Sequence, residues 1–189
     1  MTEKLDSMFP EGYKAPTGDS QFMKLKDGDN KFRVLTPAVI GWEGWRNNKP
    51  FRVPFVIGQD CPIKDDEVDF DQTYGKPKIN HFWAFTIWNY GEKKVQVLEI
   101  TQKTIMRAIE NYYIVEDWGD PRYYDLNIKR DKVGDKISYS VIPTPPKPLS
   151  KEATEAFESS KVDLSKLFSG EYPMGNPTTD STGIEQPPF

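Results

Sequence analysis

Short runs in which apolar and polar residues alternate recur along the first 143 residues and predict β-strands. These runs cover residues 30–42, 50–58, 81–101, 122–130 and 135–143. The run at 81–101 is interrupted by Asn-Tyr-Gly-Glu-Lys at 89–93, which predicts a hairpin with glycine in its turn. Pro54 in the second run indicates an edge strand or a bulge, because proline cannot donate to a ladder.

The period of the pattern changes at residues 101–113. Ile105, Ala108, Ile109 and Tyr112 fall at positions that share one face of an α-helix. Thr101 or Thr104 is the expected N-cap, and Asp-Trp-Gly-Asp-Pro at 117–121 predicts the turn that ends the helix.

The order of elements is strand, strand, hairpin, helix, strand, strand, which predicts a mainly β fold. A single helix between the third and fourth strands is typical of the five-stranded OB-type Greek-key barrel. A β-sandwich with one helix and an open α+β sheet are the alternatives.

The composition divides the chain into four parts. Residues 1–29 form an N-terminal arm and residues 30–149 the OB-type domain, with an acidic loop or small insertion at 59–80 and a proline-dense linker at its end. Residues 150–170 are a short helical segment, and residues 171–189 have the composition of a disordered C-terminal tail.

The net charge of −4 is unevenly distributed. Residues 1–150 hold 22 basic and 22 acidic residues, whereas residues 151–189 hold 3 basic and 7 acidic ones. Six of the acids lie between Asp60 and Asp71, where Lys64 is the single base. Outside this acidic loop the body is therefore mildly basic, as a polyanion-binding surface requires.

Cellular location is constrained by what the chain contains. Cys61 is the single cysteine, so no internal disulfide can form. The N-terminal residues have no apolar run like that of a signal peptide, and no stretch has the length of a membrane span. We expect a soluble cytoplasmic protein, in the infected bacterial host cell if the chain is phage-encoded.

Both faces of the strand at 81–90 carry aromatic rings. Phe82 and Trp88 point to one side, and Trp83 and Phe85 to the other. Because one face suffices to fill a core, the surplus rings are candidates for stacking on unpaired bases, at about 1–3 kcal/mol per base. The alternative is a thick core in which the arm or the C-terminal helix covers the second face.

Two sets of residues are candidates for nucleic-acid contacts. The candidates for base stacking are Trp45, Trp83, Phe85, Trp88, Tyr90, Tyr123 and Tyr124. The candidates for phosphate contacts are Arg33, Arg46, Arg52, Lys76, Lys78, Lys129, Arg130 and Lys132.

Catalysis finds little support in the sequence. His81 is the single histidine, and with Cys61 it supplies only two zinc ligands of the four required. The acids from Asp65 to Asp71 lack the spacing of a calcium loop. We expect no enzyme activity, no cofactor and no metal site, with a magnesium-dependent nuclease as an alternative for the acidic loop.

The C-terminus is a candidate for protein interaction. An apolar end on a flexible acidic tether can enter the pocket of a partner, while its carboxylate meets a basic side chain. The residues of this predicted interaction tail are Ile184, Glu185, Pro187, Pro188 and Phe189.

A resemblance to a known family rests on local stretches within residues 30–149. The stretches HFWAFTIWNYGEKKVQVLEITQKTIMRAI, DWGDPRYYDLNIKR and YSVIPTPPKPL resemble the single-stranded DNA-binding proteins of tailed bacteriophages, distantly including the T-even helix-destabilising protein. The end of the chain also looks like the terminus of bacterial single-stranded DNA-binding proteins, although it is less acidic. Some T-even relatives carry zinc in the region matching 58–80, but the residues here do not support carrying the metal over.

The resemblance implies an OB fold that binds single-stranded DNA without strong sequence preference during phage replication, recombination or repair. It also implies that the tail recruits replication or recombination proteins, and self-association on DNA is possible. The alternatives are an OB-type module for RNA or protein, and a structural phage component whose rings form a subunit interface.

Overall fold

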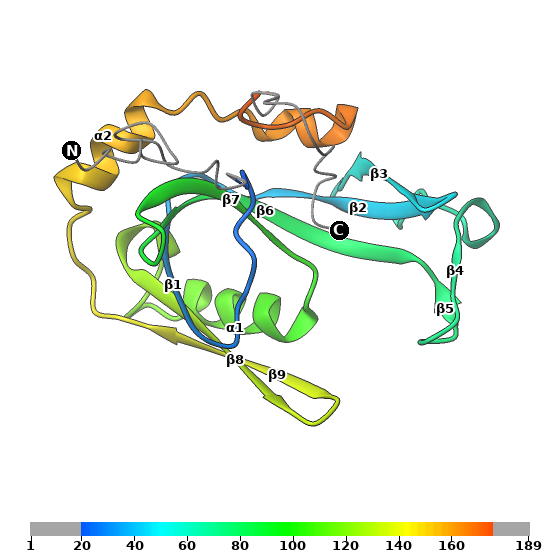
Figure 1. Ribbon diagram of the computed structural model, residues 1–189, viewed down its shortest axis with the longest axis horizontal. Helices are drawn as coiled ribbons and strands as arrows, with labels where there is room; N and C mark the ends of the chain where they lie inside the picture. The colour runs from blue at the N-terminus through cyan, green and yellow to red at the C-terminus, as the bar shows by residue number, and fades with distance from the viewer. Residues whose placement is uncertain (1–19, 176–189) are drawn as a thin grey trace, which may run out of the picture.

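The computed structural model describes residues 20–175, which form a mainly β protein with a large antiparallel sheet (Figure 1). The long strands are β1 (Gly28–Val34), β2 (Val39–Arg46), β3 (Lys49–Pro54), β6 (Ile79–Asn89), β7 (Lys94–Ile100), β8 (Asp125–Val133) and β9 (Lys136–Pro143). The helices are α1 (Lys103–Ile114) and α2 (Lys151–Ser159), with 3-10 turns η1 (Asp65–Glu67), η2 (Pro121–Tyr123) and η3 (Leu164–Ser169).

Strand β6 is the centre of the sheet. On one side its first half pairs with β2 and its last residues pair with β1, and on the other side it pairs with β7. Strand β3 extends the sheet beyond β2, while β8 and β9 extend it beyond β1. The strand expected at 30–42 is therefore two strands, separated around Pro37, which has no amide hydrogen for the ladder.

The strands do not close into a barrel within the part of the chain that the structure describes. Strands β7 and β9 share no ladder. Instead, the arm pairs with the free edge of β7, where the Met23 amide donates to the Val97 carbonyl at 2.9 Å and the Val97 amide donates to Gln21 at 2.8 Å. The prediction of a mainly β fold is confirmed. The arm, however, pairs with the edge of β7 that would have to pair with β9 to close a barrel.

Helix α1 covers the inner face of the sheet, as the sequence pattern predicts. Ile105, Met106 and Ile109 are buried against Phe85 and Ile87 of β6. The helix begins two residues after the expected position, and the cap residue is Gln102, which makes no side-chain cap hydrogen bond. The helix is therefore held mainly by its apolar face.

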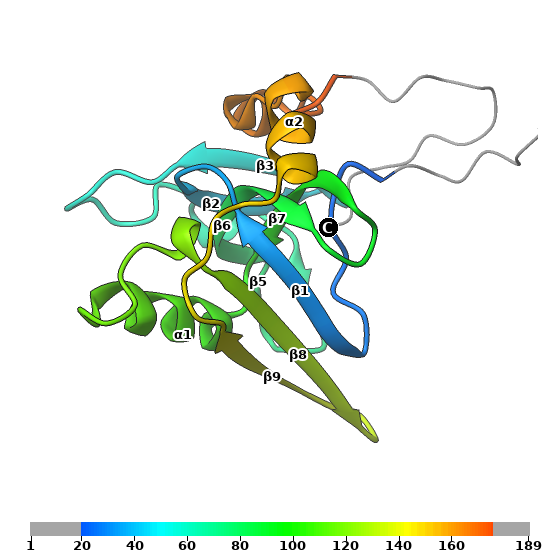
Figure 2. The same ribbon diagram turned by 90° about the vertical axis from the view of Figure 1, so that its left-hand side faces the viewer.

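The outer face of the hairpin β6–β7 is covered by the C-terminal helical segment (Figure 2). Phe82 packs with Leu164 and Leu167 of η3, and Trp88 packs with Ala153 of α2. Gly41 permits this packing, because a Cβ there would lie 2.7 Å from the Phe82 ring and 2.9 Å from the Phe168 ring. The alternative expectation, a thick core in which the C-terminal helical segment covers the second face of the strand, is therefore correct for this face.

Residues 47–78 make an excursion between β2 and β6 that begins with β3. Within it, β4 (Phe70–Asp71) pairs with β5 (Lys76–Pro77), so the expected loop holds a small hairpin of its own. Asn47 and Asn48 turn the chain from β2 to β3 with φ of 54° and 58°. The Asp69 carboxylate accepts from both of their amides at 2.9 and 2.7 Å, which ties the excursion to the sheet.

The turn of the β6–β7 hairpin differs in detail from the expectation. The positive φ lies at Lys93, at 51°, and not at Gly91. The Asn89 side-chain oxygen accepts from the Gly91 amide at 2.9 Å and from the Glu92 amide at 3.3 Å. The asparagine side chain thus shapes the turn.

Among residues 20–175, none of the helices has both the length and the apolar character needed to cross a bilayer.

Candidate nucleic-acid interface

A polar cleft lies where the 47–78 excursion meets the end of β7 and the start of α1. Its volume is about 440 Å³. Trp45, Lys76 and Lys78 come from the excursion side, and Thr101 and Gln102 from the opposite side. The predicted candidates Trp45, Lys76 and Lys78 are thus brought together, although they are separated by up to 33 positions in the sequence.

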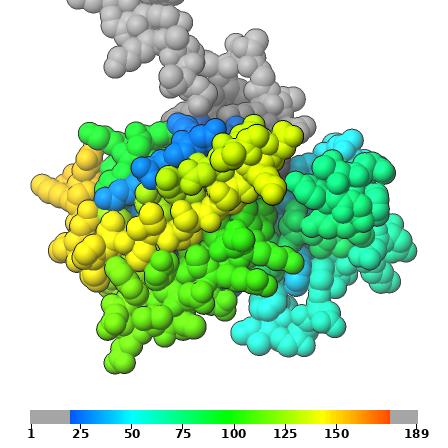
Figure 3. Space-filling view, turned by 90° about the horizontal axis from the view of Figure 1, so that it is seen from below, coloured from blue at the N-terminus to red at the C-terminus, as the bar shows by residue number. Residues whose placement is uncertain are grey.

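A second cavity of about 290 Å³ continues the polar cleft, because both are lined by Glu99 and Gln102. Lys24 of the arm, Arg130 of β8 and Tyr139 of β9 line this part. Lys132 is exposed and lies two residues beyond Arg130, on the same face of β8. Seen from below, the surface is hollowed between the excursion and the part formed by α1, β8 and β9 (Figure 3).

Glu43 and Glu99, which line the polar cleft, belong to an ionic cluster centred on Arg52. The Arg52 guanidinium lies 2.8 Å from a Glu43 carboxylate oxygen and 3.0 Å from Glu99. Trp45 is anchored to the same cluster, because its indole nitrogen donates to Glu43 at 3.1 Å. Arg52 and Glu43 are buried, so Arg52 holds the two carboxylates and is not available to a ligand.

The Glu99 carboxyl is poised to titrate near neutral pH. Burial raises its pKa to about 7, against the opposing charge of Arg52 and together with the nearby Glu43 carboxylate. Since Glu99 lines both cavities, its protonation removes a negative charge from the place where Lys76, Lys78 and Arg130 would attract an anion. The cleft is therefore more receptive to phosphate when Glu99 is neutral.

The opposite face of β2 and β6 carries an aromatic cluster of Trp42, Phe55 and His81. The ring centroids of Trp42 and His81 are 4.7 Å apart, and those of Phe55 and His81 are 5.4 Å apart. All three rings are half-buried. Burial lowers the pKa of His81, and the nearby charge of Lys103 lowers it further, so the imidazole stays neutral at pH 7.

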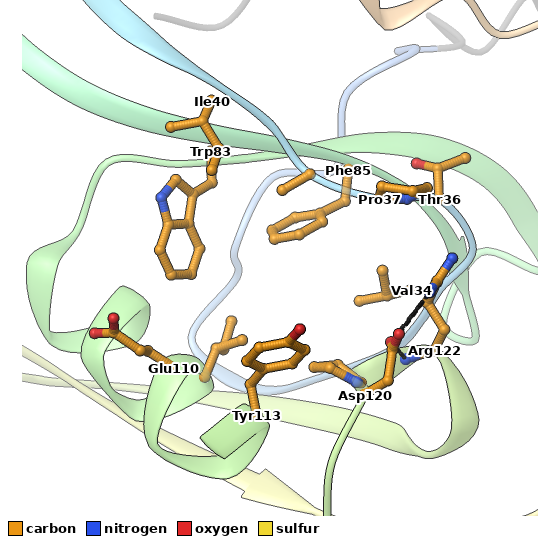
Figure 4. Close-up of a pocket in the computed structure, with 13 residues that line it drawn as sticks. Val34, Thr36, Pro37, Ile40, Trp83, Phe85, Glu110, Tyr113, Asp120 and Arg122 are labelled. Atoms are coloured by element: carbon orange, nitrogen blue, oxygen red, sulfur yellow. Dashed lines mark hydrogen bonds and ion pairs between the residues drawn. The ribbon is translucent and has the colours of Figure 1, made fainter. Parts of the chain in front are cut away.

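An apolar pocket of about 420 Å³ is lined by Ile40 and Trp83, among others (Figure 4). These two residues lie on the same faces of β2 and β6 as Trp42 and His81. Trp83 points from β6 towards Tyr113 of α1. The rings of Trp83 and Phe85 pack edge to face, with 6.2 Å between their centroids. At the rim, Arg122 donates to both oxygens of Asp120. The pocket has apolar walls and few polar groups, which suits an apolar side chain or an uncharged ring.

Five of the predicted contact residues are buried. Arg33 is 2% exposed and pairs with Asp125 at 2.7 Å, and Trp88 is 2% exposed. Tyr124 and Phe85 belong to the core beneath α1, and Arg52 belongs to the ionic cluster. Because stacking and phosphate contact require accessible atoms, these five predictions do not agree with the structure.

Four further predicted residues, Tyr123, Tyr90, Arg46 and Lys129, do not line the polar cleft. Tyr123 is 67% exposed. Tyr90 is half-buried, with its hydroxyl donating to Asp125 at 2.8 Å; burial and this hydrogen bond raise its pKa to about 12. Arg46 is exposed but donates to the Glu67 carbonyl at 2.9 Å. Lys129 lies on the face of β8 opposite to Arg130.

Several residues at these surfaces were not among the sequence candidates. Lys24 and Tyr139 line the polar cleft, and Trp42, Phe55 and His81 form the aromatic cluster. The period-2 pattern of the strand at 39–46 could have indicated that Trp42 and Trp45 lie on opposite faces. The predicted interaction tail lies outside the described residues.

A scan of protein-family models finds no match to this chain, and a search of curated protein sequences finds none either.

Proposed function

We propose that the protein binds single-stranded DNA without strong sequence preference along the polar cleft. The observation that carries the proposal is the convergence there of cations and rings from distant parts of the chain. Lys76 and Lys78 line the polar cleft beside the half-buried ring of Trp45. Arg130, which pairs with Asp27, lines the adjoining cavity with the half-buried ring of Tyr139. Lysine and arginine neutralise backbone phosphates, and the rings give bases a stacking surface.

The topology supports the same proposal. The pairings β7–β6, β6–β1, β1–β8 and β8–β9, with α1 between β7 and β8, support the OB-type topology that we propose. In that fold the loops after the first and fourth strands border the ligand groove. Here the 47–78 excursion and the β8–β9 hairpin occupy these places and flank the polar cleft.

The resemblance to phage single-stranded DNA-binding proteins supports a role in replication, recombination or repair, in which the C-terminal tail recruits other replication proteins. In this account the protein is a non-enzymatic coat for transient single strands. The chemistry of the polar cleft favours binding, because Arg52 holds the Glu43 and Glu99 carboxylates while Lys76 and Lys78 line the same cleft.

The test is equilibrium binding of fluorescent oligo-dT at several salt concentrations. The proposal predicts that log K falls linearly with log salt, with a slope of about −0.7 for each phosphate neutralised. The double substitution Lys76→Gln and Lys78→Gln should flatten that slope, while the matched control Lys151→Gln and Lys161→Gln should leave it unchanged. Absence of binding at low salt would refute the proposal.

A protein-binding module is the second candidate, and the apolar pocket favours it. Trp83, Phe85 and Tyr113 offer an apolar surface beside the charged pair of Asp120 and Arg122. Competition with an equal-length RNA separates DNA from RNA binding. A protein-binding module would bind neither the oligo-dT nor the RNA.

A further inference from the structure

A second cationic site surrounds Asp125 at the start of β8, away from the residues that line the polar cleft. Asp125 is fully buried and receives three cations. The Arg33 guanidinium lies 2.7 Å from one carboxylate oxygen, while the ammonium groups of Lys31 and Lys147 lie 3.3 and 2.8 Å from the other. Three positive charges thus face one negative charge.

The excess positive charge is open to solvent. The side chains of Lys31 and Lys147 are 41% and 47% exposed, whereas Arg33 is buried. An ammonium group has three donors, and each lysine uses one direction towards Asp125. In the part of the chain that the structure describes, no other acidic side chain forms an ion pair with either lysine. Outward-pointing donors therefore remain on both.

The two lysines are held in place by the backbone and by Tyr90. Lys31 belongs to β1 and pairs with Asn127 of β8. The Lys147 amide donates to the Tyr123 carbonyl at 3.2 Å, and its own carbonyl accepts from Arg33 at 3.1 Å. Both ammonium groups lie over the Tyr90 ring, at 5.0 and 5.5 Å from its centroid.

We propose that Lys31 and Lys147 form a phosphate-binding site. Because both ammonium groups lie within 3.3 Å of the same Asp125 oxygen, they are close enough for one phosphate group to contact both. Lysine binds phosphate as a point charge and needs no bidentate geometry. The phosphate belongs either to a nucleic-acid strand or to a free anion, and the site itself does not depend on the proposed function.

The first arm of the test measures thermal unfolding of the full chain in sodium phosphate and in sodium chloride at equal ionic strength. Phosphate should raise the Tm of the wild-type protein, because a ligand that binds the folded state stabilises it. The rise should be lost in Lys31→Gln with Lys147→Gln and kept in Lys31→Arg with Lys147→Arg. The control pair Lys26→Gln and Lys151→Gln, both exposed lysines in other ion pairs, should keep it too.

The second arm measures the salt dependence of oligo-dT binding by the same variants. A slope reduced by about 0.7 in the Lys31→Gln, Lys147→Gln variant identifies a strand phosphate as the ligand. If the salt slope is unchanged but phosphate no longer raises the Tm of the variant, the ligand is a free anion. Either result supports the site. If the double variant does not fold, Lys31→Gln alone serves, since its ion pair with Asp125 is the longer one.

Two outcomes overturn the site. One is a wild-type Tm that phosphate does not raise, and the other is a rise of equal size in the wild type and in the glutamine variant. Failure of the wild-type protein to bind oligo-dT would instead count against the proposed function, because the first arm contains no DNA.

Discussion

At the scale of single residues, position decides which aromatic side chain can report on a ligand. Trp45 and Trp118 are both half-buried. Trp45 lines the polar cleft, whereas Trp118 does not and packs against Tyr124 with 5.4 Å between the ring centroids. Because only a ring within reach of the bases can stack on them, Trp45 is the informative tryptophan and Trp118 is its control.

Substitution of Trp45 should remove the fluorescence signal of DNA binding. We expect oligo-dT to quench the wild-type protein, and expect Trp45→Phe to lose most of this quenching and to bind several-fold more weakly. Trp118→Phe should keep both. Quenching that survives in Trp45→Phe but disappears in Trp42→Phe would place the strand on the aromatic cluster instead.

Protonation of Glu99 should couple pH to binding. Since the pKa of Glu99 is about 7, lowering the pH from 8 to 6 neutralises a carboxylate in the cleft and should strengthen oligo-dT binding. Because one proton is taken up, the binding constant can rise at most tenfold for each pH unit. Glu99→Gln should bind at pH 8 as tightly as the wild type at pH 6, with a flat profile between. An equally steep profile in the variant would contradict this role.

The same titration bears on stability. Because the folded pKa of Glu99 lies above the ordinary value of 4.5, the folded state binds the proton more tightly than the unfolded state. This contribution is complete below about pH 4.5 and is lost as the pH rises through 7. Urea unfolding of Glu99→Gln should therefore show less loss of stability between pH 5 and pH 8 than the wild type.

At the scale of elements, α2 and η3 act as a cover for the outer face of β6 and β7. Trp88 is 2% exposed beneath α2, and Phe82 is fully buried beneath η3. Trp88→Ala should lower the free energy of unfolding by about 3–5 kcal/mol, as for other large core rings. Chemical denaturation measures it, with exposed Tyr123→Ala as the control. A change below 1 kcal/mol would mean that the cover is loosely attached.

The elements themselves were largely predictable from the sequence. The alternation at 81–101 located the β6–β7 hairpin, and the helical spacing of Ile105 and Ile109 located α1. The pairing of the arm with β7 was not predictable, because one extended stretch at Gln21–Met23 has no periodic signature. The small hairpin in the acidic excursion was missed because strands of two residues are too short to show alternation.

At the scale of the whole molecule, the candidate site was predictable only in part. Basic residues and surplus rings were visible in the sequence. Trp45, Lys76 and Lys78 do line one cleft, and Arg130 lines the cavity that adjoins it. Which rings are surplus depends on long-range packing. Trp88 is covered by α2, which begins 63 positions later, and Arg33 and Arg52 neutralise buried carboxylates that no local pattern reveals.

The central claim is that the polar cleft holds the strand, and photocrosslinking tests it most directly. Oligo-dT carrying 5-bromouracil, bound to the full chain and irradiated, should crosslink to peptides that contain Trp45 and Tyr139, and excess unlabelled oligo-dT should suppress these products. Crosslinks confined to Trp42, Trp83 or Tyr113, or no specific crosslink under conditions that saturate the protein, would contradict the account.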